Sequence, residues 1–259
     1  MYIRFNELSI SRIFSAIKRR IYFVYHYLMW SLSKKNTNIP NRKHDDVVIV
    51  CNGPSLSDID FSSFNNVDFI TMNRSYLSFE DFKIEPRYHV CINKNVLEQF
   101  NEDLAKVEPF KFYNFECKKY FKTSDIKNNF WIMPSYSLFD KFSIEIGKPL
   151  TSGGTVTFVA LQIAAYLNYK RIFIIGMDHN FDSTSKPNLT EKRIGKDNNH
   201  FRPDYFPEGM VWDTPDLYRS EEAYKKALNY FKLNATEIYD CTKNGKCEVF
   251  EKRNIKDFF

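Results

Sequence analysis

Glycine, paired cysteines and long apolar runs are scarce or missing in this sequence of 259 residues. Glycine occurs only 8 times, so adjacent glycines are expected where the backbone requires them. The five cysteines are scattered and include no C-x-x-C pair, which argues against a zinc site or a disulfide framework and favours a reducing cytoplasm. No stretch approaches the roughly 18 apolar residues of a membrane-spanning helix, and the first residues lack the apolar run of a signal peptide. We therefore expect the protein to remain on the side of the membrane where it is made.

Acidic residues are missing from one part of the chain near the N-terminus, and the net charge of +5 arises from the basic residues in that part. Residues 8–44 hold eight Lys or Arg and no Asp or Glu, whereas the chain from Asp45 onward holds 28 basic and 31 acidic residues. A nucleic-acid enzyme usually carries a basic stripe on its body, so we expect no nucleic-acid partner. We predict a basic N-terminal arm and linker over residues 1–44 and one Rossmann-like domain over residues 45–259.

The arm has the pattern of a basic amphipathic helix that runs to about Leu32. Basic residues alternate with apolar residues that recur at helical spacing, namely Ile10, Ile13, Phe14, Ile17, Ile21, Val24 and Leu28. One interpretation is peripheral contact with the inner membrane through residues 8–32, on the cytoplasmic side. The other is packing against the domain or against a second subunit in a homo-oligomer. Both interpretations fit the pattern.

Apolar runs that predict strands alternate with segments that predict helices. The predicted strands are 47–51, 69–72, 88–92, 111–114, 130–133, 171–175, 237–241 and 247–250, and the predicted helices are 155–168 and 220–233. Ser220 is the expected N-cap of the second helix, and Asn168 the left-handed cap of the first. This alternation predicts an α/β fold, most simply a single Rossmann-like domain with a mainly parallel sheet. A long polar region at about 182–214 predicts a lid.

Two turns of small residues have the composition of anion-binding loops. Asn52-Gly53-Pro54-Ser55 follows the first predicted strand, where Gly53 lets the backbone approach a phosphate. Thr151-Ser152-Gly153-Gly154-Thr155 precedes a predicted helix, whose N-terminus presents N–H groups and partial positive charge. Neither turn matches the dinucleotide fingerprint or the P-loop. The alternative for the first of these segments is an ordinary turn between a strand and a helix. The alternative for the second is a helix N-cap at Ser152 or Thr155.

Further candidates are polar residues near the ends of predicted strands and in the lid. Asp178, with Asp182, can bind a divalent cation or orient a substrate hydroxyl, although Asp178 can also cap its own turn. His200 can act as a general base, because imidazole exchanges a proton near neutral pH. The amides of Asn73 and Asn93 can read the edge of a base or a sugar.

Taken in order, these segments resemble two families. The closer resemblance is to surface-polysaccharide-cluster proteins with a domain named for 6-hydroxymethylpterin pyrophosphokinase, and the more distant one is to bacterial lipooligosaccharide sialyltransferases. The resembling blocks are Cys51-Asn52-Gly53-Pro54-Ser55-Leu56, Asn73-Arg74-Ser75-Tyr76-Leu77, Gly153-Gly154-Thr155-Val156-Thr157-Phe158, Ile175-Gly176-Met177-Asp178-His179-Asn180-Phe181 and His200-Phe201-x-x-x-Tyr205-Phe206. The sialyltransferases use CMP-sialic acid on a Rossmann-like fold without a metal. The resemblance implies that Asn52, Asn73 and Asn93 contact a nucleotide sugar, with Ser152 and Gly153 at its phosphate or carboxylate.

The resemblance implies a glycosyltransferase that moves a sugar from a nucleotide donor, specifically a CMP-activated one, to a cell-surface glycan or lipid-linked acceptor. We expect His200 to be the catalytic base, with Asp178 or His179 as the alternative, and no metal or other cofactor to be required. An ATP-dependent pterin pyrophosphokinase that uses Mg²⁺ is a rival interpretation. A non-catalytic nucleotide-binding protein of polysaccharide assembly is another.

Overall fold

The computed structural model describes residues 10–33, 38–122, 128–137, 139–181 and 186–259. The chain divides into two compact units, Met1–Lys35 and Asn36–Phe259. The first unit contains helix α1 (Ile10–Leu32), which confirms the predicted helix of the arm. Among the described helices, none has the length and apolarity that crossing a membrane would need. The second unit holds the sheet and the other helices.

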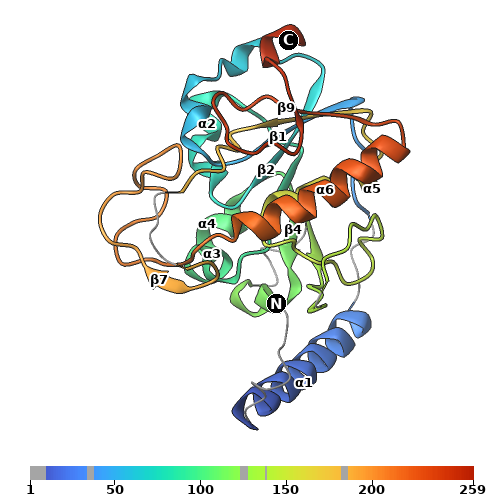
Figure 1. Cartoon of the computed structure of the whole chain (residues 1–259), viewed down its shortest axis with the longest axis vertical. Coiled ribbons are helices and arrows are strands. Elements are labelled where there is room, and N and C mark those ends of the chain that lie inside the picture. The colour runs from blue at the N-terminus through green and yellow to red at the C-terminus, as the bar shows by residue number, and fades with distance from the viewer. Residues whose placement is uncertain (1–9, 34–37, 123–127, 138, 182–185) are drawn as a thin grey trace. The chain divides into compact units, whose positions relative to one another are not determined.

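The second unit is built on a sheet of eight parallel strands (Figure 1). Their order is β10-β9-β6-β1-β2-β3-β4-β5. The bounds are β1 (Asp46–Val50), β2 (Val67–Met72), β3 (Tyr88–Cys91), β4 (Phe110–Asn114), β5 (Asn129–Ile132), β6 (Arg171–Ile175), β9 (Glu237–Asp240) and β10 (Glu251–Lys252). Two further strands, β7 (Thr190–Lys192) and β8 (Val211–Asp213), form a separate antiparallel pair. The parallel sheet confirms the predicted α/β fold.

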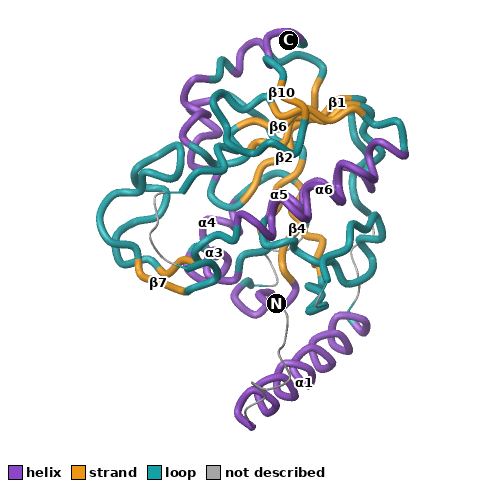
Figure 2. Tube along the Cα trace, in the orientation of Figure 1, coloured by secondary structure: helices purple, strands orange, loops and turns teal. Residues whose placement is uncertain are grey.

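Helices and loops cover the two faces of the sheet (Figure 2). The helices of this unit are α2 (Phe79–Phe82), α3 (Lys94–Gln99), α4 (Asn101–Lys106), α5 (Val156–Tyr166) and α6 (Leu217–Leu233). Val47 and Ile49 of β1 belong to a core cluster with residues of α5 and α6, whereas Val48 and Val50 belong to a second cluster. Successive strand residues point to opposite faces, and both faces are buried. This double burial explains why the strands read as unbroken apolar runs.

The strand order changes direction at β1, and this change locates the candidate site. The chain adds β2, β3, β4 and β5 on one side of β1, and then returns through α5 to place β6 on the other side. Val50 is therefore in register with Thr71 on one side and with Ile175 on the other. In open parallel sheets, ligands bind beyond the carboxyl ends of the strands at such a point.

Two predictions of local structure are wrong at the C-terminal end of the chain. Helix α6 begins at Leu217, because the Asp216 side chain accepts a hydrogen bond from Arg219 N at 3.1 Å and acts as the N-cap in place of Ser220. Residues 247–250 do not form a strand, since Cys247 and Phe250 are buried in the core and the ladder forms at β10 instead. Asn168, with a φ of 58°, has the predicted left-handed conformation.

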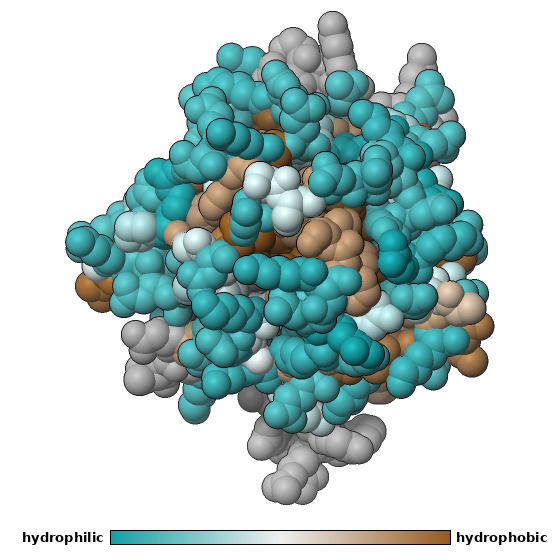
Figure 3. Space-filling view, turned by 90° about the horizontal axis from the view of Figure 1, so that it is seen from above, coloured by the Kyte–Doolittle hydropathy of each residue, from teal (hydrophilic) through white to brown (hydrophobic). Residues whose placement is uncertain are grey.

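Seen from above, the surface is mainly hydrophilic, and apolar residues show in a recess near its centre (Figure 3). Most of the aromatic residues contribute to the core, where Tyr88, Tyr113, Tyr169, Tyr205, Phe112, Phe158, Phe173 and Phe231 are fully buried. The high aromatic content of 17% is therefore used mainly for packing.

Candidate functional site

The turn after β1 is held by the turn after β6. Gly53 N donates to Gly176 O at 2.8 Å, and Ser55 donates to the Asp178 carboxylate through its amide at 3.2 Å and its hydroxyl at 2.7 Å. These residues lie 123 positions apart in the chain and meet because β1 and β6 are neighbours. The Asp178 side chain thus stabilises the turn after β1 and does not cap its own turn after β6.

Only glycine fits at position 53. A Cβ placed there would lie 1.9 Å from Asp178 Oδ2 and 2.7 Å from Gly176 O, both far inside van der Waals contact. The glycine therefore permits the close approach of the two turns that forms a cradle at the strand ends. We use the term cradle for Asn52, Gly53, Pro54, Ser55 and Asp178.

Two buried amide oxygens of predicted nucleotide ligands have no hydrogen-bond partner among the residues that the structure describes. They are Asn52 Oδ1, after β1, and Asn73 Oδ1, after β2. Asn129, at the start of β5, also has unpartnered buried atoms, but it lies at the opposite edge of the sheet. Burying a polar atom without a partner costs about 1–3 kcal/mol, so such atoms on neighbouring strand ends point to a ligand that supplies donors.

Asn73 is held in place by a buried histidine. Its φ of 52° lies in the left-handed region, and its carbonyl oxygen accepts from His89 Nε2 at 3.0 Å. His89 Nδ1 lies 2.9 Å from Thr71 Oγ1. Burial lowers the pKa of His89 to about 3, so the ring stays neutral and acts as a structural bridge. The hydrogen bond from His89 therefore fixes the backbone of Asn73, and the fixed backbone in turn sets the direction of the Asn73 side chain.

Asn93 has a structural role that leaves only part of its side chain available. Its Oδ1 accepts from Asn95 N at 2.9 Å and from Val96 N at 3.3 Å, which caps α3. Its amide NH₂ is the group that remains for the predicted contact with a nucleotide sugar.

The glycine turn before α5 has a packing function that the sequence did not reveal. A Cβ on Gly153 would lie 2.5 Å from the Cβ of Ala223, so glycine lets α6 approach this turn. Gly153 N donates to Asp140 Oδ1 at 3.1 Å, and Arg219 donates to both oxygens of Asp140 at 2.8 and 3.0 Å. A carboxylate of the chain itself thus contacts the predicted anion loop.

The other residues of this turn are also engaged within the chain. Thr155 is the N-cap of α5 and accepts from Thr157 N at 3.2 Å, as one alternative predicted. Gly154 N donates to Ser152 Oγ at 3.4 Å, and Thr151 Oγ1 donates to Lys141 O at 2.9 Å.

The N-terminus of α5 nevertheless points toward the cradle. Thr157, in its first turn, places Oγ1 3.5 Å from Cys51 Sγ and 3.7 Å from Met72 Sδ. Cys51 and Met72 directly precede Asn52 and Asn73 in the chain. The partial positive charge of the helix N-terminus therefore lies at the same edge of the sheet as Asn52 and Asn73, where it favours an anionic ligand.

His200 forms a hydrogen-bonded pair with a buried carboxylate. Its Nδ1 lies 2.7 Å from Oδ2 of Asp197, whose side chain is 0% exposed. Burial raises the pKa of Asp197, but hydrogen bonds from His200 and Asn199 N and the charge of Arg193 outweigh it and lower that pKa overall. In the neutral form of the ring, an ionised Asp197 holds the proton on Nδ1 and leaves the lone pair on Nε2, which is the group that a general base needs.

The region around His200 is anchored to the cradle and to the body. Phe201 N donates to Asn52 O at 3.0 Å. The rings of Tyr205 and His200 are stacked, with their centroids 4.0 Å apart and an angle of 7° between their planes. Tyr205 OH accepts from Arg74 N at 3.2 Å, and Arg74 lies 3.7 Å above the Phe100 ring. These contacts bring His200 beside Asn52, although 147 residues separate them in the sequence.

The remaining candidates are His179 and Asp182, and the structure describes only His179. His179 is paired with Glu221 at 3.0 Å on α6, and its ring contacts Tyr224. Asp182 lies outside the described residues. Across the ranges that the structure describes, no group of three or more His, Cys, Asp or Glu is placed to hold a metal ion.

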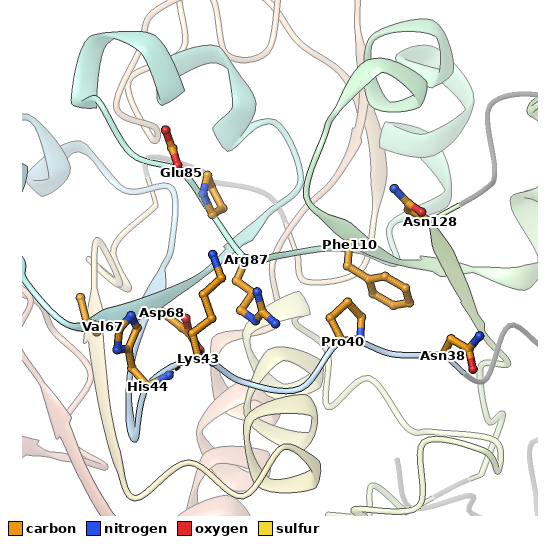
Figure 4. Close-up of a pocket in the computed structure, with 11 residues that line it drawn as sticks. Asn38, Pro40, Lys43, His44, Val67, Asp68, Glu85, Arg87, Phe110 and Asn128 are labelled. Atoms are coloured by element: carbon orange, nitrogen blue, oxygen red, sulfur yellow. Dashed lines mark hydrogen bonds between the residues drawn. The ribbon is translucent and has the colours of Figure 1, made fainter.

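Two cavities lie at the other edge of the sheet and are separate from the cradle. One has a volume of about 590 Å³ and is lined by Lys43, Asp68 and Arg87 among others (Figure 4). The second, of about 830 Å³, is lined by residues next to the starts of β1 and β6. The Asp68 carboxylate at the first cavity already accepts from Lys43 N at 2.8 Å and from Tyr169 OH at 2.7 Å. We place the candidate site at the carboxyl edge, because the unpartnered oxygens of Asn52 and Asn73 lie there on neighbouring strand ends.

Sequence reasoning named His200 but missed the groups that orient it. Asp197 precedes His200 by three residues, a spacing that can place an acid beside an imidazole, and this local signal was available. The roles of Tyr205 and Arg74 depend on contacts between distant segments and had no local signal.

Replacing Asp197 by Asn should reduce stability in a pH-dependent way. Because the pKa of Asp197 is lowered in the folded protein, its contribution to stability is present above the ordinary aspartate pKa of 3.8 and is lost as pH falls through the folded pKa. The urea midpoint of Asp197→Asn should therefore lie below that of the parent at pH 7, and the difference should shrink toward pH 3.8 and below. The exposed carboxyl of Asp204, paired with Arg202, provides the control, and Asp204→Asn should have little effect. A constant difference at all pH values would contradict this account.

Comparison with known proteins gives a family and a fold. No curated protein matches the chain. The MAf glycosyltransferase from Magnetospirillum magneticum AMB-1 is similar in structure, with a TM-score of 0.56 and 15% identity over 85% of this chain. The chain spans 35% of that protein's length. The fold is thus shared with a glycosyltransferase.

Two sialyltransferases from Campylobacter jejuni are also similar. The monofunctional alpha-2,3-sialyltransferase Cst-I matches with a TM-score of 0.47 and 18% identity, over 86% of this chain and 85% of its own. CstII, in complex with the substrate analogue CMP-3FNeuAc, matches with a TM-score of 0.43 and 19% identity, over 80% of this chain and 85% of its own. The family model of 6-hydroxymethylpterin diphosphokinase MptE-like proteins covers residues 20–184. Since this match takes in more than half of the sequence, the chain belongs to the MptE-like family.

Proposed function

We propose that this protein is a glycosyltransferase that transfers a sugar from a nucleotide donor, specifically a CMP-activated one, to a cell-surface glycan or lipid-linked acceptor. The observation that carries the proposal is the pair of unpartnered amide oxygens of Asn52 and Asn73 at the strand switch point. The order of the motifs, which resembles that of the sialyltransferases, supports CMP as the nucleotide. The fold, shared with a glycosyltransferase, is compatible with this chemistry.

The proposed reaction is a direct displacement at the anomeric carbon of the donor. His200 Nε2 takes the proton of the acceptor hydroxyl while the acceptor oxygen bonds to the anomeric carbon. The bond between that carbon and the nucleotide phosphate oxygen breaks, and the phosphate leaves with the electron pair. The N-terminus of α5 stabilises the charge that develops on the phosphate. Asp197 keeps the imidazole oriented and stabilises its protonated form.

Thermal unfolding with CMP, UDP, GDP and ATP, each with and without Mg²⁺, tests the nucleotide. We expect CMP to raise the Tm without metal and Asn52→Leu to abolish the shift, because the substitution removes the oxygen that accepts from the ligand. Asn129→Leu is the matched control, since it removes a buried unpartnered amide at the opposite edge of the sheet and should keep the shift. Loss of the CMP-induced rise in Tm in both variants would contradict the assignment of the cradle as the nucleotide-binding site.

An ATP-dependent diphosphokinase acting on a pterin is a second candidate, favoured by the family to which the chain belongs. Such a reaction needs Mg²⁺ beside the transferred phosphate. Stabilisation by ATP with Mg²⁺ and by no other nucleotide would support this candidate and sink the CMP proposal. Stabilisation by none of the nucleotides would favour a non-catalytic role in polysaccharide assembly.

A further inference from the structure

Helix α1 carries a continuous apolar stripe that is exposed along its length. At about 100° per residue, seven apolar side chains project onto roughly 100° of the helix circumference. They are Phe14, Ile17, Ile21, Val24, Tyr25, Leu28 and Leu32. Their exposed fractions range from 46% for Val24 to 80% for Leu32. We call this set the α1 stripe, and exposed apolar surface of this extent marks an interaction site.

Basic residues flank the α1 stripe on both sides. On the same helical projection, Lys18 and Arg20 lie within about 40° of its two edges, whereas Arg19 lies on the opposite side. All three are exposed. Long basic side chains at the edges of an apolar stripe can bury their methylenes and extend their charges to the same surface. A surface that complements this helix therefore has an apolar interior, which the stripe can enter, and anionic groups at its boundary with water, which the basic side chains can contact.

The composition of the helix favours a lipid surface over a second copy of the chain. The segment 10–32 holds four basic residues and no acidic residue. Two such helices packed stripe to stripe would bring like charges together with no acid to pair across the interface. Anionic lipid headgroups supply the missing charge, at about 1 kcal/mol for each basic residue near the membrane surface.

We propose that α1 lies in the plane of an anionic membrane surface, with the α1 stripe in the interface and Lys18 and Arg20 at the headgroups. Tyr25 within the stripe and Tyr22 beside it are rings of a kind that settle at this depth. The choice of the cytoplasmic face of the inner membrane as this surface rests on the proposed function, whose acceptor is lipid-linked. This attachment is independent of the proposed transferase activity.

Co-sedimentation of the full chain with vesicles tests the proposal. The protein should bind vesicles of phosphatidylglycerol and phosphatidylcholine and bind pure phosphatidylcholine at least tenfold more weakly. Ile17→Glu with Ile21→Glu should reduce binding to the anionic vesicles by at least tenfold, because two charges enter the stripe. Arg20→Gln and Arg19→Gln are a matched pair of neighbours, and only Arg20→Gln should weaken binding, by about fivefold.

The possible results separate attachment from other roles of α1. Unchanged vesicle binding in the Ile17→Glu, Ile21→Glu variant would overturn the proposal. So would a parent protein that sediments as a dimer in ultracentrifugation and whose stripe variant becomes monomeric without a change in vesicle binding. The nucleotide-induced rise in Tm is measured on the same variants, so loss of nucleotide binding and loss of membrane binding are scored separately.

Discussion

Replacing His200 by Asn should lower kcat by about 10²- to 10⁴-fold, the range that general-base catalysis contributes. The Asn amide can still donate to Asp197 at the position of Nδ1, but it has no group that accepts a proton in the place of Nε2. The CMP-induced rise in Tm should remain, because His200 is not among the groups that hold the nucleotide. Initial rates with a CMP-sugar donor, together with thermal unfolding, measure the two effects separately.

His179→Asn is the control for this experiment, because His179 was the other histidine candidate. Its ring is turned to Glu221 on α6, and its φ of 54° is one that Asn tolerates. The variant should keep kcat within a few-fold of the parent. A normal rate in His200→Asn combined with a lost rate in His179→Asn would transfer the role of base to His179.

Gly53→Ala should abolish nucleotide binding and destabilise the fold. The added methyl would meet Asp178 Oδ2 at 1.9 Å and Gly176 O at 2.7 Å, and the second of these atoms is backbone that cannot rotate away. Overpacking of this kind costs about 1–3 kcal/mol, and each kcal/mol lowers the Tm by about 2–4 °C in a protein of this size. Differential scanning calorimetry and titration with CMP measure the two losses.

Gly147→Ala is the matched control, since a Cβ at that glycine meets nothing within 4 Å. It should leave both the Tm and CMP binding unchanged. Adding Asp178→Ala to Gly53→Ala should cost less than the sum of the two single changes, because it removes one of the two clashes. Strict additivity would mean that the methyl at position 53 is accommodated by a movement of the turn.

The strands, and the positions of Asn52 and Asn73 at strand ends, were predictable because their signals are local. A strand buried on both faces is an apolar run, and Asn52 and Asn73 follow such runs directly. The role of Asp178 was not predictable, since the hydroxyl that it binds belongs to Ser55. The sequence showed that glycine was required at Gly153, but it could not show that Ala223 was one reason. Such reasons lie in contacts between segments that the fold brings together.

The segment from β7 to β8 illustrates the same limit. Sequence reasoning predicted a lid with few regular elements, but the region includes an antiparallel pair of strands. Its aromatic residues Tyr205, Phe206 and Trp212 are buried in a core cluster with residues of α3 and α4. A three-residue strand carries too little periodicity to be recognised, and its stability comes from this packing.

That packing has a thermodynamic consequence for ligand binding. With Tyr205 buried and stacked on His200, the conformational entropy of this segment is lost when the protein folds. In the reaction that we propose, a ligand entering the cradle would meet His200 already in position and would need to order few additional residues. Rigid surroundings of this kind also limit adaptation, so the fixed walls around His200 would select the shape of the proposed acceptor.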